Sequence, residues 1–103
     1  MKLSKKRCKF THMASLLVLY IEQMGYHAAY DDVMRKKTCS HGHPNSTHRS
    51  GLAVDMVIYD SDWNYLSHGL IYAIAHDFWD QIGGARRIEK DLGHFSLPWK
   101  GVR

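Results

Sequence analysis

The segment from Gly51 to Tyr59 constrains the fold more than any other, because it places one carboxylate inside an apolar strand. Successive side chains of a strand point to opposite faces. One face then holds Leu52, Val54, Met56 and Ile58, and the other holds Ala53, Asp55 and Val57. Burying an unpaired carboxylate costs several kcal/mol. Asp55 therefore needs a cation, a set of hydrogen-bond donors or a metal ion beside it.

Two further segments have the apolar spacing of amphipathic helices. The first follows a basic lead-in, residues 1–9, which we expect to be frayed; Thr11 is its predicted N-cap and Gly25 its stop. Its stripe consists of Phe10, Ala14, Leu17, Ile21 and Met24. The second is predicted from a Ser67 cap to Ile82, before Gly83 and Gly84. Its stripe consists of Leu70 or Ile71, Ile74, Ala75, Phe78 and Ile82.

The remaining segments are short. We expect extended chain over 26–35, a loop over 36–50, a turn at 60–62, a return strand at 63–66 and a last strand at 93–97. This order predicts a small α+β fold, in which a small antiparallel sheet packs against two or three helices. The 103 residues form a single domain in this interpretation.

Composition excludes some classes of protein. No apolar run approaches the ~20 residues of a membrane helix, so we expect no membrane insertion. The basic start lacks a convincing signal-peptide cleavage site, which predicts a protein made in the cytoplasm. Two cysteines, Cys8 and Cys39, fit reduced thiols. The formal charge of +4 suits an anionic partner without selecting one.

Three residues could form a metal site if the strands at 51–59 and 93–97 are neighbours. His48, Asp55 and His94 would then converge, and two imidazoles with one carboxylate and an open position form a catalytic zinc set. Asp91 stands three residues before His94, close enough to act as general base on a metal-bound water. Arg35 could stabilise an oxyanion or hold a substrate carboxylate.

Each of these residues also has an ordinary structural interpretation. Backbone donors could satisfy Asp55, His94 could be a core histidine, Asp91 could begin a turn, and Arg35 could be a surface residue. Glu89 is a rival to Asp91 for the role of base. Cys39, His41 and His43 form either a polar loop or a secondary metal site. The other histidines look like ordinary surface or partly buried residues: His12, His27, His68 and His76.

The motifs resemble those of a known family, the zinc peptidoglycan peptidases that include D-Ala-D-Ala dipeptidases, D,D-carboxypeptidases and the L-alanyl-D-glutamate endopeptidases of phage lysins. The first motif, Ser-x-His-x-x-Gly-x-Ala-x-Asp, is complete as Ser46, His48, Gly51, Ala53 and Asp55. The second, an acid followed by a histidine and an aromatic residue, is Asp91, His94 and Phe95. The resemblance extends over about Lys9 to Leu97.

The resemblance implies a hedgehog/DD-peptidase-like fold and one catalytic zinc ion bound by His48, Asp55 and His94. Asp91 would be the general acid and base; some members instead use a glutamate at the position of Leu92 here. Arg35 would act near the substrate, and Ser46 would anchor its polar groups.

The function expected from this likeness is hydrolysis of a bond in the bacterial peptidoglycan stem peptide, most simply the L-alanyl-D-glutamate bond. The enzyme would be a monomer that acts on the cell wall and binds no nucleic acid. Three alternatives stay open: a D-Ala-D-Ala carboxypeptidase or dipeptidase, a non-catalytic structural protein that contains zinc, and a small basic nucleic-acid-binding module.

Overall fold

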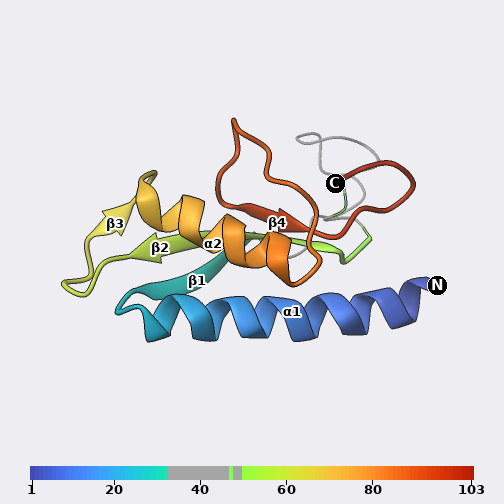
Figure 1. Ribbon diagram of the computed structural model, residues 1–103, viewed down its shortest axis with the longest axis horizontal. Coiled ribbons are helices and arrows are strands. Elements are labelled where there is room, and N and C mark those ends of the chain that lie inside the picture. Colours follow the sequence, from blue (N-terminus) through green and yellow to red (C-terminus); the bar gives the residue numbers. More distant parts are fainter. Residues whose placement is uncertain (33–46, 48–49) are drawn as a thin grey trace.

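Two helices and a four-stranded antiparallel sheet make up the part of the chain that the computed structural model describes, namely residues 1–32, 47 and 50–103 (Figure 1). The elements in chain order are α1 (Leu3–Gln23), β1 (His27–Asp32), β2 (Ala53–Tyr59), β3 (Tyr65–Leu66), α2 (Leu70–Gln81) and β4 (His94–Ser96). The prediction of a small α+β protein with an antiparallel sheet is therefore confirmed.

Strand β2 is the centre of the sheet. It pairs with β1 along one edge, where His27 faces Tyr59, and with both β3 and β4 along the other. The C-terminal strand β4 pairs with the first half of β2, and the two-residue strand β3 pairs with its end. The apolar alternation of β2 explains this central place, since one face can be buried while the other carries polar side chains.

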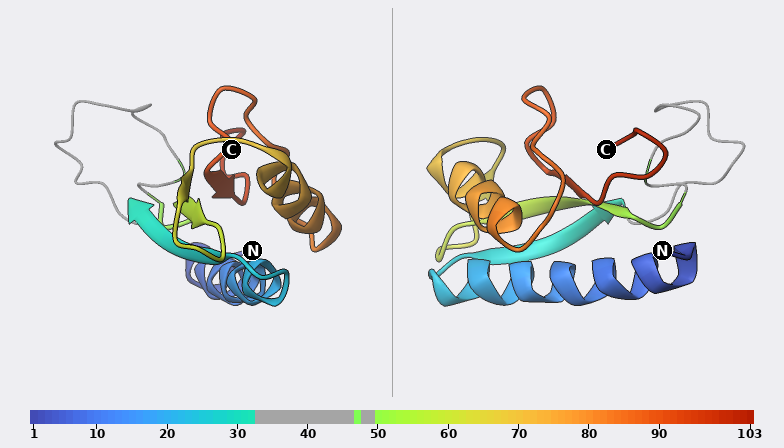
Figure 2. Two further views of the ribbon diagram at one scale, coloured as in Figure 1. Left: turned by 90° about the vertical axis from the view of Figure 1, so that its left-hand side faces the viewer. Right: turned by 45° about the vertical axis from the view of Figure 1, so that its right-hand side comes forward.

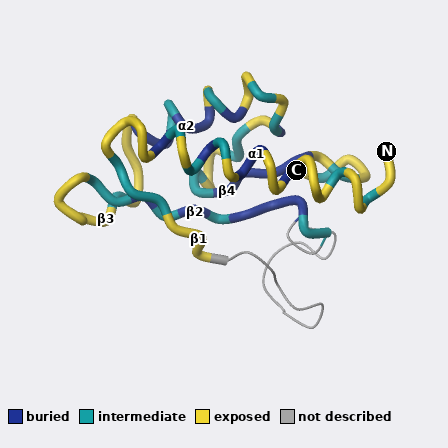
Figure 3. The backbone as a smooth tube through the Cα atoms, turned by 90° about the horizontal axis from the view of Figure 1, so that it is seen from below, coloured by how far each residue is buried: buried dark blue, intermediate teal, exposed yellow. Residues whose placement is uncertain are grey.

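The two helices bury the apolar face of β2. Helix α1 runs along the underside of the sheet in Figures 1 and 2, and it meets α2 through an edge-to-face contact of Phe10 with Trp79, with ring centroids 5.8 Å apart. The side chains of Leu52, Val54, Met56 and Ile58 are at most 2% exposed and join this core. Figure 3 shows burial alternating along both helices. Neither of these helices has the length and apolar character needed to cross a bilayer.

The start of α1 differs from the prediction. Residues 3–9 are helical, and Thr11 donates its hydroxyl to the Arg7 carbonyl inside the helix, so it is not the N-cap. Lysine and arginine are good helix formers, and the first turns are tied to the far end of the chain, where Lys6 donates to the carbonyl of Pro98. The predicted stop is confirmed, since Gly25 adopts a φ of 91°.

The buried side of α2 is rotated from the predicted stripe. Leu70 is 75% exposed, and Ile74 and Phe78 are only partly buried. Ile71 and Ala75 are buried as predicted, and the other buried residues of the helix are Tyr72, His76 and Trp79, which the predicted stripe did not include. The helix begins after Gly69 with no side-chain cap, so the predicted Ser67 cap is wrong. The first turns of α2 carry apolar residues on every side. The spacing of apolar residues therefore could not predict which side of the helix is buried.

In α1, Met13 is buried and Met24 is 39% exposed, whereas the predicted stripe included Met24 and not Met13. Met24 is the C-cap of the helix, where the chain already turns away towards β1. The other four residues of the predicted stripe are buried: Phe10, Ala14, Leu17 and Ile21.

Candidate metal centre

The pairing of β2 with β4 brings two candidate ligands together. Asp55 and His94 are direct cross-strand partners, so their side chains leave the sheet on the same face. Asp55 Oδ1 lies 3.6 Å from His94 Nδ1, and the two side chains are 17% and 7% exposed. These residues could meet only if the two strands were neighbours, and the strands do pair.

Asp91 joins this pair from the turn that leads into β4. The turn is held by two backbone hydrogen bonds: Asp91 N–H donates to Ile88 O at 2.9 Å, and His94 N–H donates to Asp91 O at 3.1 Å. One ligand atom from each of Asp55, Asp91 and His94 lies within 4.8 Å of the other two. We call these three residues the metal cluster.

Gly93 lets the turn approach β2 closely. Its carbonyl accepts a hydrogen bond from Met56 N–H at 2.8 Å. A Cβ atom at this position would stand 2.7 Å from Met56 O, closer than real Cβ atoms approach. Any larger residue would push the turn away from the strand, and Asp91 would move with it.

The chemistry and spacing of the metal cluster fit a divalent ion. Two carboxylates and one imidazole are ligands that zinc accepts. Two ligand atoms that are each about 2.1 Å from a tetrahedral zinc lie about 3.4 Å apart. The measured separation of 3.6 Å between Asp55 and His94 is close to that value. Two carboxylates in one place also repel each other, and a bound cation would remove that cost.

A pocket of about 270 Å³ opens beside the metal cluster. Three carboxylates face it, from Asp31, Asp55 and Asp91, together with one cation, Lys90. The other lining residues are Met56, Val57, Tyr65, Ser67, Tyr72, Leu92 and Gly93. The excess of acidic groups makes this pocket attractive to a cation, and its polar lining suits a peptide substrate.

Tyr72 supports the wall of this pocket. Its hydroxyl donates to Leu66 O at 2.6 Å and accepts from Ile58 N–H at 3.2 Å, which ties α2 to the β2–β3 hairpin. Burial is the largest influence on this group and raises the pKa of Tyr72 above its usual value. The phenol therefore stays protonated at neutral pH and acts as a structural hydrogen-bond donor.

Several predicted site residues lie outside the described residues. These are Arg35, Ser46 and His48, as well as the loop residues Cys39, His41 and His43. Thr47, which is described, is buried, and its carbonyl accepts Leu52 N–H at 2.8 Å. Of the predicted ligands and base, the structure therefore places Asp55, Asp91 and His94, and it brings all three together.

The rival base, Glu89, lies elsewhere. It lines a larger pocket of about 640 Å³ that holds none of the metal cluster. The other lining residues are Asp80, Arg86, Arg87, Ile88, Lys90 and Arg103. Despite its size, this pocket is not the candidate metal centre, because Asp55 and Asp91 line the smaller one. Asp91 is thus the better-placed carboxylate of the two.

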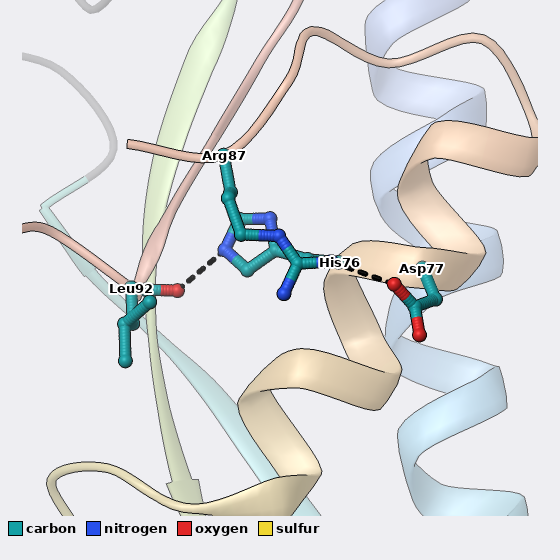
Figure 4. Close-up of polar contacts among 4 residues, drawn as sticks. All are labelled: His76, Asp77, Arg87 and Leu92. Atoms are coloured by element: carbon teal, nitrogen blue, oxygen red, sulfur yellow. Dashed lines mark hydrogen bonds and ion pairs between the residues drawn. The ribbon is translucent and has the colours of Figure 1, made fainter. Parts of the chain in front are cut away.

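The position of His76 differs from the prediction. It is fully buried on α2, contrary to the expectation of a surface or partly buried residue. Its Nε2 lies 2.7 Å from the carbonyl oxygen of Leu92, between Asp91 and His94 (Figure 4). Burial is the main cause that lowers the pKa of His76, which favours the neutral ring. Its spacing from Trp79, one helical turn later, was the signal that could have placed it in the core.

Comparisons with known proteins assign no family to the chain. A scan against protein-family models finds no match, and a search of curated proteins finds no matching sequence. The candidate metal centre therefore stands on the geometry of its own residues.

Proposed function

We propose that this chain is a zinc-dependent peptidoglycan peptidase, with a fold related to the hedgehog/DD-peptidase type, that cuts a stem-peptide bond. The observation that supports the proposal best is the convergence of Asp55, Asp91 and His94. These residues belong to two motifs that are far apart in the sequence. A chance likeness of either motif would not require their side chains to meet.

The chemistry follows from what each residue offers. A bound zinc would supply a Lewis acid that polarises the peptide carbonyl and lowers the pKa of a bound water. Asp55 and His94 would hold the ion, with His48 as the third ligand. The Asp91 carboxylate takes a proton from the attacking water and returns it to the leaving amine. Its place on an exposed turn gives it access to both groups.

Two further roles rest on the resemblance. Arg35 would stabilise the developing oxyanion, and Ser46 would hold polar groups of the substrate. The pocket next to Asp55 and Asp91 is where the stem peptide would lie. Lys90, at its rim, offers a positive charge to a substrate carboxylate.

The experiment is a digest of purified peptidoglycan with the zinc-loaded protein, followed by mass analysis of the products. We expect release of a new alanine carboxyl group and a new glutamate amine. The Asp91→Asn variant should keep zinc and lose about 10²- to 10⁴-fold in rate. Glu89→Gln is the matched control, because it removes a nearby carboxylate outside the metal cluster, and it should digest as the wild type does.

Other outcomes would change the bond that is assigned to the enzyme or would overturn the proposal. Release of D-alanine from a defined pentapeptide stem would identify a carboxypeptidase, and cleavage of free D-alanyl-D-alanine into two alanines would identify a dipeptidase. Bound zinc with no hydrolysis of any wall fragment would point to a structural zinc site. Salt-sensitive binding to DNA by a zinc-free protein would favour the nucleic-acid module.

A further inference from the structure

The turn between Asp91 and His94 is held at three consecutive carbonyl groups. The carbonyl of Asp91 accepts His94 N–H at 3.1 Å, within the turn itself. The carbonyl of Gly93 accepts Met56 N–H at 2.8 Å, from β2. The carbonyl between them, that of Leu92, faces His76 Nε2 at 2.7 Å. His76 is thus the side chain that fixes the middle of this turn.

The direction of this hydrogen bond follows from its partner. A carbonyl oxygen can only accept, so His76 Nε2 must carry the hydrogen, and Nδ1 then carries a lone pair. The ring is locked in place by stacking on Phe95, with centroids 4.1 Å apart and planes inclined by 13°. From helix α2, His76 therefore contacts Leu92, two residues before His94 (Figure 4). It also contacts Phe95, directly after His94.

A histidine at this position carries a cost for stability. His76 Nδ1 is buried and has no hydrogen-bond partner among the residues that the structure describes. An unsatisfied buried polar atom costs about 1–3 kcal/mol, and a phenylalanine would fill the same space without that cost. The useful property of the histidine is its single N–H, directed at the Leu92 carbonyl.

We propose that His76 is a positioning residue for the metal cluster: by holding the Leu92 carbonyl and the Phe95 ring, it fixes the turn that carries the ligand His94 and the base Asp91. The assignment of that cluster to a metal rests on the proposed function. Ligands must be held within about 0.5 Å of their productive geometry, and their supporting hydrogen bonds do this work. Loss of such a support typically weakens metal binding about 10- to 100-fold.

The chain offers a matched control on the same helix. Trp79 stands one turn after His76, is fully buried, and donates its ring N–H to Ser96 O at 2.9 Å. Each of the two aromatic rings therefore ties α2 to the β4 segment through one ring N–H. The carbonyl that Trp79 contacts, that of Ser96, lies after His94 and outside the turn from Asp91 to His94. The substitutions His76→Phe and Trp79→Phe each remove one such donor and keep a ring.

The experiment measures zinc affinity by competition with a chromophoric chelator in His76→Phe, His76→Gln and Trp79→Phe. We expect His76→Phe to bind zinc about 10- to 100-fold more weakly. His76→Gln, which keeps an N–H donor, should recover part of that loss, and it also serves if His76→Phe does not fold. Trp79→Phe should lower the unfolding temperature but leave zinc affinity within about threefold of the wild type, by the same reasoning.

A second readout needs no metal. Exchange of the His94 amide hydrogen, which bonds to Asp91 O, should be faster in metal-free His76→Phe than in Trp79→Phe. If the wild type bound no zinc, the proposed function would fail, while faster exchange in His76→Phe would still support the positioning role. The positioning role would be overturned if His76→Phe kept the wild-type exchange rate and zinc affinity. It would also be overturned if His76→Phe and Trp79→Phe lost zinc affinity equally.

Discussion

The two faces of β2 differ in chemistry although they share one backbone. The face towards the helices carries Val54, Met56 and Ile58, whose side chains are at most 2% exposed. The opposite face carries Asp55, Val57 and Tyr59, which are only partly buried. The first face supplies apolar burial, which stabilises the fold. The second holds the metal cluster, whose side chains are chemically suited to bind a cation. Substitutions on the two faces should therefore separate stability from metal binding.

The largest effect on stability is expected on the apolar face. Ile58→Ala removes a fully buried side chain from the core and leaves a cavity. We expect the free energy of unfolding to fall by about 2–5 kcal/mol, measured by urea titration. Zinc affinity at a temperature where the variant is folded should stay near that of the wild type. A large loss of zinc affinity in the folded variant would show that the two faces are not independent.

The opposite result is expected from the other face. Asp55→Asn keeps the size of the side chain and removes its charge, so zinc affinity should fall about 100-fold or more, equivalent to about 2.7 kcal/mol. The metal-free variant should lose far less stability than Ile58→Ala, since no apolar side chain is removed and no cavity forms. Thermal unfolding with and without zinc checks both points. Destabilisation of the metal-free variant by several kcal/mol would contradict this separation.

A smaller effect is expected on the pH dependence of stability, through the buried ring of His76. Burial lowers the pKa of His76 in the fold, whereas an unfolded histidine titrates near about 6.5. The neutral ring thus contributes stability that is present above pH ~6.5 and is lost as the pH falls through the lowered folded pKa. The hydrogen bond to Leu92 and the charge of Asp80 oppose this lowering of the pKa, and Arg87 adds to it.

Urea unfolding of the metal-free protein at several pH values between neutral and mildly acidic conditions measures this loss. The His76→Gln variant removes the titrating ring, so its stability should decline less steeply as the pH falls. Identical pH profiles for the wild type and this variant would show that the buried ring does not contribute to acid lability.

The smallest effect is expected at the tip of the β2–β3 hairpin. Trp63 adopts a φ of 67°, is 67% exposed and stacks on His27 with centroids 3.7 Å apart. Trp63→Gly would relieve backbone strain of about 1–2 kcal/mol and lose a stacking contact of about 0.5–1.5 kcal/mol. The two terms nearly cancel, so unfolding should change by less than about 1 kcal/mol. A larger loss would show that this tip is part of the stabilising structure.

Local patterns predicted much of the fold. Alternation identified the buried face of β2, and the spacing of Phe10, Ala14, Leu17 and Ile21 identified the buried side of α1. Contacts between segments that are distant in the sequence determine two features that local patterns did not predict: the start of α1 and the buried side of α2. The first turns of α1 are tied to Pro98, and Lys6 lies over the ring of Trp99. The buried side of α2 is set by Trp79, against which Gly84 packs so closely that a Cβ would stand 1.9 Å from its Nε1.

The candidate site was predictable to the extent that it depends on strand pairing. The motif residues Asp55 and His94 could be expected to meet once their strands were taken as neighbours, and the register of β2 with β4 pairs them. The role of His76 could not be predicted, because it depends on where one helix lies over one carbonyl. A histidine among apolar residues gives no sign of that contact in the sequence.

A zinc titration of the metal-free protein, with metal content checked by mass spectrometry, tests the central claim most directly. We expect one zinc ion per chain in the wild type and in Asp91→Asn. We expect zinc affinity to fall about 100-fold or more in both Asp55→Asn and His94→Gln, which remove a ligand each. A wild-type protein that takes up no zinc, or ligand variants that bind it as tightly as the wild type, would contradict the account.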